Sequence, residues 1–162
     1  MVFDPKLFRP PRNYRLDDAL YRCPGSVYFF TIRAYRGSSP FSSLELSAQT
    51  ITALVLEQAR LHCQVYVYCL MPDHLHFLLS PLTDRDSVLA FVAQYKGRTT
   101  RMAWQCGWKG RLWQPRYYEH VVRTEEGVRA TADYILANPV RKGLVQTPNA
   151  WPWAGQLNPL PL

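Results

Sequence analysis

The spacing of hydrophobic and polar positions along the chain changes several times, and each spacing predicts one element. Residues 27–35 are rich in β-branched and aromatic side chains, which favours a strand. Residues 42–45 then have the spacing of a capping box, and apolar residues recur every three or four positions from Leu44 to Ala59. This pattern predicts a helix of about five turns.

Two further β-rich runs, at residues 64–70 and 74–80, flank the turn signal Pro72-Asp73, which predicts a β-hairpin. Thr83 and Asp86 then have the spacing of a helix start. The following helix is expected to end in the basic segment at residues 96–101.

The last predicted strand covers residues 117–122. Thr124 follows as an N-cap residue, with two glutamates in the first turn of the next helix. This helix is expected to end near Asn138, because the residue before Pro139 avoids helical geometry.

The order strand, helix, strand, strand, helix, strand, helix is typical of an α+β fold. It predicts a ferredoxin-like antiparallel sheet with helices on one face and an additional C-terminal helix. A chain of 162 residues suits one domain. We expect an extended basic arm at residues 1–26, a main domain at 27–145 and an irregular Pro/Trp-rich tail at 146–162, which docks through its aromatic residues.

Composition adds charge to this picture. The chain has 19 Lys and Arg against 12 Asp and Glu, for a net charge of +7, which favours a polyanionic partner such as nucleic acid or else indicates only a solvated surface. The four cysteines are widely spaced and are interpreted as reduced thiols. With no apolar run of bilayer-spanning length, a cytoplasmic protein is expected.

The first candidate for chemistry is a pair of histidines. His74 and His76 are two positions apart in a predicted strand, so both imidazoles point to one face of the sheet. Such a pair can share a divalent cation if further ligands complete the coordination. The alternative is a pair of solvent-facing strand histidines. His62 and His120 do not share that face and are interpreted as structural or substrate-adjacent.

The second candidate lies on the last predicted helix. Tyr134 and Asn138 are four positions apart and share a helix face. The amide oxygen of Asn138 could bind a hard metal ion, and the phenol of Tyr134 could attack a metal-polarised phosphate. The alternative is that Tyr134 packs at the margin of the core and Asn138 is an ordinary residue of a helix C-terminus.

A third feature is a segment in which cations and aromatic residues alternate. Cations can follow the phosphates of single-stranded nucleic acid, and exposed aromatic faces can stack on its bases. The alternative is that some of the tryptophans belong to the core, Trp113 first among them. The predicted DNA-binding residues are Lys96, Arg98, Arg101, Lys109, Arg111, Arg116, Arg123, Trp104 and Trp108.

Four segments resemble one known family. The sequence YCLMPDHLHFLL at residues 68–79 is similar to the His-hydrophobic-His motif of the HUH single-tyrosine transposases. The sequence YILANPVRKGLV at residues 134–145 resembles the tyrosine helix of their REP-associated branch, and residues 24–31 and 112–120 also look like that branch. The resemblance covers about residues 12 to 145.

This resemblance implies a function as well as a ferredoxin-like fold. His74, His76 and Asn138 would hold Mg²⁺ or Mn²⁺, and Tyr134 would be the nucleophile. The implied enzyme is a single-stranded DNA endonuclease and strand transferase that acts at or near a hairpin by transesterification and leaves a 5′-phosphotyrosine. The related insertion-sequence branch usually has glutamine as the last ligand, so Asn138 favours the REP-associated branch.

Two other functions compete with this interpretation. The first is a non-catalytic, domesticated DNA-binding protein of the same fold, and the second is a metal-dependent hydrolase that uses water and forms no covalent adduct. The sequence leaves open whether the protein is a monomer or a homodimer.

Overall fold

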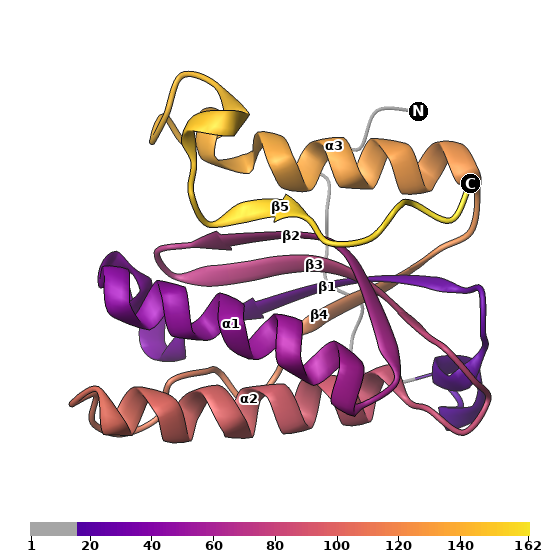
Figure 1. Cartoon of the computed structure of the whole chain (residues 1–162), viewed down its shortest axis with the longest axis horizontal. Coiled ribbons are helices and arrows are strands. Elements are labelled where there is room, and N and C mark those ends of the chain that lie inside the picture. Colours follow the sequence, from indigo (N-terminus) through magenta and orange to yellow (C-terminus); the bar gives the residue numbers. More distant parts are fainter. Residues whose placement is uncertain (1–15) are drawn as a thin grey trace.

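A computed structural model describes residues 16–162 and shows one antiparallel sheet between two helical layers (Figure 1). The strand order is β4-β1-β3-β2-β5. Helices α1 and α2 cover one face of the sheet, and α3 covers the other. The elements are β1 (Val27–Arg33), α1 (Leu44–Arg60), β2 (Cys63–Met71), β3 (His74–Pro81), α2 (Val88–Gln105), β4 (Tyr118–Val122), α3 (Glu125–Arg141) and β5 (Ala154–Gln156).

The alternation of side chains along the strands gives the sheet two separate hydrophobic cores. On β1, Tyr28, Phe30 and Ile32 pack under α1 and α2. Phe29 of the same strand packs under α3, together with Val128. The predicted fold is therefore confirmed, with two helices on one face and the last helix on the other.

The β2–β3 hairpin and strand β1 bring together residues that are far apart in sequence. Thr31 pairs with His76, and Arg33 pairs with His74, in the antiparallel register of β1 and β3. Directly paired residues project to the same face of an antiparallel sheet. These four side chains therefore lie on the α3 face, at the end of the sheet where β2 turns into β3.

The prediction of an extended basic arm at residues 1–26 is partly wrong. Residues 1–15 lie outside the described part of the chain. In the remainder, residues Asp18–Arg22 form a 3-10 helix, and Tyr21 is buried in the core under α2. The Tyr21 hydroxyl donates a hydrogen bond to the Glu119 carboxylate. This part of the segment is docked rather than extended, because its aromatic residues have a core to enter.

Two helix starts differ from the sequence prediction. Helix α1 is capped by Ser43, whose hydroxyl accepts a hydrogen bond from the Leu46 amide. Helix α2 is capped by Ser87, because Thr83 and Asp86 are hydrogen-bonded to each other in the preceding turn. Helix α2 also continues to Gln105 and so runs through the basic segment in which it was expected to end.

Helix α3 does not end before Pro139, as predicted, but continues to Arg141 with the proline inside it. The last turn is stabilised by a Schellman motif around Gly143, which has a φ of 69°. The Gly143 amide donates to the Val140 carbonyl, and the Leu144 amide donates to the Pro139 carbonyl. These bonds compensate for the disfavoured geometry of the residue before proline.

The C-terminal tail is more regular than predicted. It docks through its aromatic residues, since the Trp151 indole donates a hydrogen bond to the Leu70 carbonyl. It also adds the short strand β5 to the edge of β2, where Val67 pairs with Gln156. No helix within residues 16–162 is long and apolar enough to cross a membrane.

Candidate active site

The two histidines of β3 converge on each other. His74 and His76 are each 5% exposed, and their Nε2 atoms are 3.0 Å apart. The side chains of Leu75 and Phe77 point to the opposite core, as the two-residue period predicts. The pair is therefore buried under α3, and the alternative of solvent-facing strand histidines is wrong.

Each histidine is also held at its other ring nitrogen. His74 Nδ1 lies 2.6 Å from Asp73 Oδ1, and His76 Nδ1 lies 2.7 Å from Thr31 Oγ1. Partners of this kind fix the orientation and the tautomer of an imidazole, which is how proteins prepare histidines as ligands. Neither partner was predicted, although Asp73 directly precedes the motif and Thr31 belongs to the predicted first strand.

Burial keeps both imidazoles neutral. It lowers the pKa of His76 well below its usual range, and the neighbouring His74 acts in the same direction. Burial also lowers the pKa of His74, although hydrogen bonding to the Asp73 carboxylate partly offsets this effect. A neutral imidazole has a nitrogen lone pair available to a cation at neutral pH.

Tyr134 lies beside this pair, on the half-buried face of α3. Its ring centroid is 5.9 Å from that of His76 and 6.3 Å from that of Phe29, in edge-to-face arrangements. From the other side, the Arg141 guanidinium lies 4.6 Å from the centroid of the Tyr134 ring. Burial raises the pKa of Tyr118, and the nearby Tyr134 phenol raises it further through electrostatic interaction.

Asn138 is one turn further along the same helix. It is 4% exposed and belongs to the face of α3 that is buried against the sheet, together with Ile135. Its backbone carbonyl accepts a hydrogen bond from the Lys142 amide, so the backbone role expected of a residue near a helix end is also present. The structure thus places Tyr134 and Asn138 on the helix that covers the histidine pair, as their spacing predicts.

Three cations that the sequence reasoning missed surround the site. Arg33 and Lys142 lower the pKa of both histidines, and Arg141 lowers that of His76. Arg33 pairs with His74 in the register of β1 and β3, which the sequence alone does not specify. Together they make the region around the histidines electropositive, which suits a phosphate.

The predicted DNA-binding residues are divided by the structure into two groups, and the first is engaged within the fold. Lys96 Nζ donates to the Gln114 carbonyl at 2.6 Å, and burial lowers its pKa. Arg98 Nη1 forms an ion pair with the buried carboxylate of Glu57 at 2.6 Å. These two cations stabilise the packing of α2, which the spacing of charges along the sequence could not reveal. Trp113 is in the core, as expected.

The second group is at the surface. Trp104 of α2 is 52% exposed, and Arg111 lies 5.6 Å from the ring centroid of Tyr35. Helix α2 lies on the face of the sheet opposite to the histidine pair, so its surface residues are not gathered around that pair. The remaining surface residues of the prediction are Arg101 of α2, Lys109, Arg116 and the half-buried Trp108 between α2 and β4, and Arg123 between β4 and α3.

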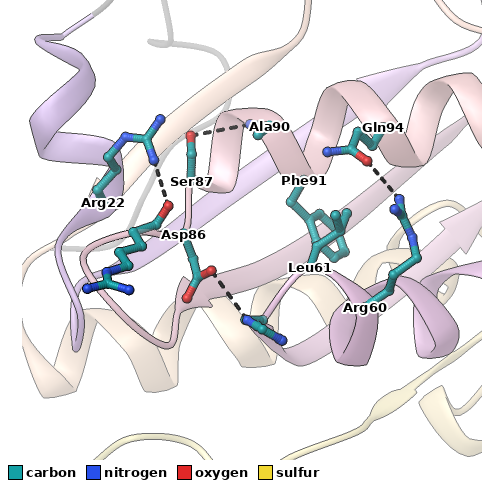
Figure 2. A pocket seen from close by; sticks show the side chains of 10 residues that line it. Arg22, Arg60, Leu61, Asp86, Ser87, Ala90, Phe91 and Gln94 are labelled. Atoms are coloured by element: carbon teal, nitrogen blue, oxygen red, sulfur yellow. Dashed lines mark hydrogen bonds and ion pairs between the residues drawn. The ribbon is translucent and has the colours of Figure 1, made fainter.

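A separate hollow of about 230 Å³ lies at the far end of the sheet (Figure 2). It is lined by Arg22, Arg60 and Arg85, and the Arg22 guanidinium donates to the Arg85 carbonyl. His62 stands at its rim, with Nδ1 3.6 Å from Asp86 Oδ1. Because His62 precedes β2 and the histidine pair follows it, this hollow is not part of the candidate active site.

Comparison with known proteins decides the family. The family model described as "Transposase IS200 like" matches residues 32–138, which is more than half of the chain. The chain belongs to this family. The IS200-like match contains the histidine pair, Tyr134 and Asn138. The chain is therefore a member of a family of DNA-handling transposases.

Individual relatives of this IS200-like transposase agree with the match. The REP-associated tyrosine transposase of Escherichia coli (strain K12) is 26% identical over 135 residues, which are 83% of this chain and 78% of that protein. A Haemophilus influenzae protein provisionally given the same name is 28% identical over 160 residues, covering 88% of this chain and 84% of the relative.

A solved structure confirms the fold of this IS200-like transposase. It is described as a REP-associated tyrosine transposase bound to a REP hairpin, and it superimposes with a TM-score of 0.73 at 25% identity. The superposition covers 88% of this chain and 81% of that one. The ferredoxin-like prediction and the predicted likeness to the REP-associated branch are both confirmed.

A divalent metal fits the donor set of the site. The two Nε2 atoms converge to 3.0 Å, and neutral imidazole nitrogens are common ligands of divalent metals. Within residues 16–162, no group of three or more His, Cys, Asp or Glu side chains gathers to hold a metal. The two imidazoles therefore need a ligand of another kind, and the Asn138 amide is a candidate.

Proposed function

We propose that this transposase cuts single-stranded DNA at or beside a hairpin and rejoins it, with Tyr134 as the nucleophile. The observation that carries the proposal is the position of the Tyr134 ring, whose centroid is 5.9 Å from that of the His76 imidazole. The Nε2 atom of the same imidazole converges on that of His74. A phenol beside a prepared cation site is the arrangement needed for attack on a phosphodiester.

His74, His76 and Asn138 would hold Mg²⁺ or Mn²⁺ in this proposal. When bound, the ion neutralises charge that develops on the phosphate oxygens. The protein supplies the orientation of the ligands through Asp73 and Thr31, which hold the outer nitrogens of the imidazoles. Thr31 can serve either tautomer of His76, because a hydroxyl both donates and accepts.

The covalent step exchanges one ester for another. The Tyr134 oxygen forms a bond to phosphorus, and the bond from phosphorus to the 3′ oxygen breaks. The phenolic proton passes to water, and the departing 3′ oxygen takes up a proton. Rejoining reverses this exchange, since an incoming 3′ hydroxyl attacks the phosphotyrosine and releases Tyr134, so no ATP is needed.

The DNA partner is proposed from the charge of the chain and from its relatives. The net charge of +7 and the cations Arg33, Arg141 and Lys142 around the histidines favour a phosphate backbone. The similar solved structure is described as bound to a REP hairpin, which supports a DNA hairpin as the substrate here.

The test incubates the protein with Mn²⁺ and labelled hairpin DNA that carries single-stranded flanks. The expected product is a protein–DNA adduct that survives denaturation and maps by peptide mass to Tyr134. Tyr134→Phe should bind the hairpin and form no adduct, whereas Tyr68→Phe, a control in the opposite core, should form it normally. Replacing both His74 and His76 by Ala should also abolish it.

The competing functions give different products in the same experiment. A domesticated DNA-binding protein would bind the hairpin and leave it intact. A metal-dependent hydrolase would cut it without any adduct. An adduct on another tyrosine, or cleavage by the double histidine variant, would contradict the assignment of the site.

A further inference from the structure

Arg141 makes a contact with the proposed nucleophile that the reaction outlined above does not use. Its guanidinium carbon lies 4.6 Å from the centroid of the Tyr134 ring, which is within the range of a cation–π interaction. The two residues are seven positions apart in α3 and therefore share a helix face two turns apart.

This contact exists because α3 continues past Pro139. A proline inside a helix removes one backbone hydrogen bond and favours an end before it. Here the Schellman motif at Gly143 stabilises the final turn, and Arg141 is the last residue of the helix. Had the helix ended at Asn138, Arg141 would have no fixed place relative to the Tyr134 ring.

Two further ring contacts of Tyr134 come from the sheet. Phe29 of β1 and His76 of β3 meet its ring edge-to-face, at 82° and 64°. Arg141, in contrast, belongs to the same helix as Tyr134. If α3 shifts relative to the sheet between cutting and rejoining, the contacts to Phe29 and His76 change while the Arg141 contact moves with the tyrosine.

We propose that Arg141 is a positioning residue for the nucleophile, which fixes the orientation of the Tyr134 ring and so of its attacking oxygen. The inference rests on the proposed role of Tyr134. Arginine remains charged at every working pH and stacks its flat guanidinium on aromatic faces, so the contact persists through the reaction.

Other charged or titratable groups also face Tyr134 and must be held constant in a test. His76 faces it from β3, and Tyr118 of β4 interacts with it electrostatically. Arg33 and Lys142 are close enough to the histidines to lower the pKa of both. Substitution of Arg141 leaves all of these side chains in the protein, and it also removes a positive charge that lowers the pKa of His76.

The experiment compares Arg141→Gln and Arg141→Lys with Arg129→Gln, which removes an equal charge from an exposed position of the same helix. The rate of adduct formation is measured at saturating hairpin DNA and Mn²⁺, and the affinity of each variant for the hairpin is measured separately. Arg141 is exposed, so thermal unfolding of all three variants should match that of the parent protein.

Arg141→Gln is expected to lower the saturated rate by about two- to fivefold, the scale of an exposed cation–π contact. The affinity for hairpin DNA should stay that of the parent protein, because a positioning residue acts on the attack and not on binding. Arg141→Lys should recover part of the rate, and Arg129→Gln should behave as the parent protein.

Three outcomes would overturn the inference while leaving the proposed function intact. The saturated rate could be unchanged in Arg141→Gln, the loss could be confined to hairpin affinity, or Arg129→Gln could lose as much of the saturated rate. Failure of the proposed function has a different signature, since Tyr134→Phe would then still form the adduct.

Discussion

Acidification should destabilise the metal-free protein well above the pH at which carboxylates titrate. The reason is His76, which is 5% exposed and whose pKa is well below its usual range, mainly through burial. The unfolded chain exposes the same imidazole with a pKa near 6.5. Below that pH the unfolded state takes up a proton that the native state excludes. The contribution of His76 to the free energy of unfolding is therefore full above pH 6.5 and is lost as the pH falls.

The magnitude follows from proton linkage. For an imidazole that stays neutral in the native state, lowering the pH from 7.5 to 5.5 reduces the free energy of unfolding by about 1.4 kcal/mol. His74 should add to this loss, because burial lowers its pKa too. Carboxylates contribute little in this range, since their ordinary pKa values are near 4.

The assay is urea unfolding followed by tryptophan fluorescence at the two pH values, in buffer with a chelator. His76→Gln should remove about 1.4 kcal/mol of the difference, whereas His62→Gln should not, because that side chain is exposed. Burial also lowers the pKa of His120, but this residue is present in every variant, so its contribution cancels in the comparison. The reasoning would be refuted if the parent protein were equally stable at both pH values. It would also be refuted if the difference in free energy of unfolding between the two pH values were undiminished in His76→Gln.

Other substitutions should act on the fold or on DNA binding. Glu57→Gln should lower the free energy of unfolding by about 2 kcal/mol in urea, because the buried carboxylate accepts charged hydrogen bonds from two arginines. Pro139→Ala should raise it by about 1 kcal/mol by restoring a helix donor. Lys109→Gln should reduce the log–log salt slope of single-strand binding by about 0.7 if it contacts one phosphate, whereas Arg98→Gln should reduce stability instead.

The strands and the histidine pair could be predicted from sequence because both depend on the two-residue period. One face of β3 is apolar and buried under α1 and α2, so the opposite face was the only place for His74 and His76. The pairing of His76 with Thr31 depends on the register between β1 and β3, which separate segments of sequence do not specify.

Helix ends and the roles of cations were harder to predict, since tertiary contacts decide them. The rule for the residue before Pro139 was outweighed by the Schellman motif at Gly143. Arg98 and Arg101 are similar in sequence context, yet Arg98 is paired with a buried carboxylate and Arg101 is exposed. The side chain that decides this difference, Glu57, is on another helix.

The arrangement of the two helical layers has a consequence for local stability. Within residues 16–162, α3 is the one long helix on its face of the sheet, whereas α1 and α2 pack side by side on the other face. Because no second helix supports α3, amide hydrogen exchange should show it as a cooperative unit that opens before the sheet does. A transient release of this helix would carry Tyr134 away while the histidine hairpin keeps its hydrogen bonds.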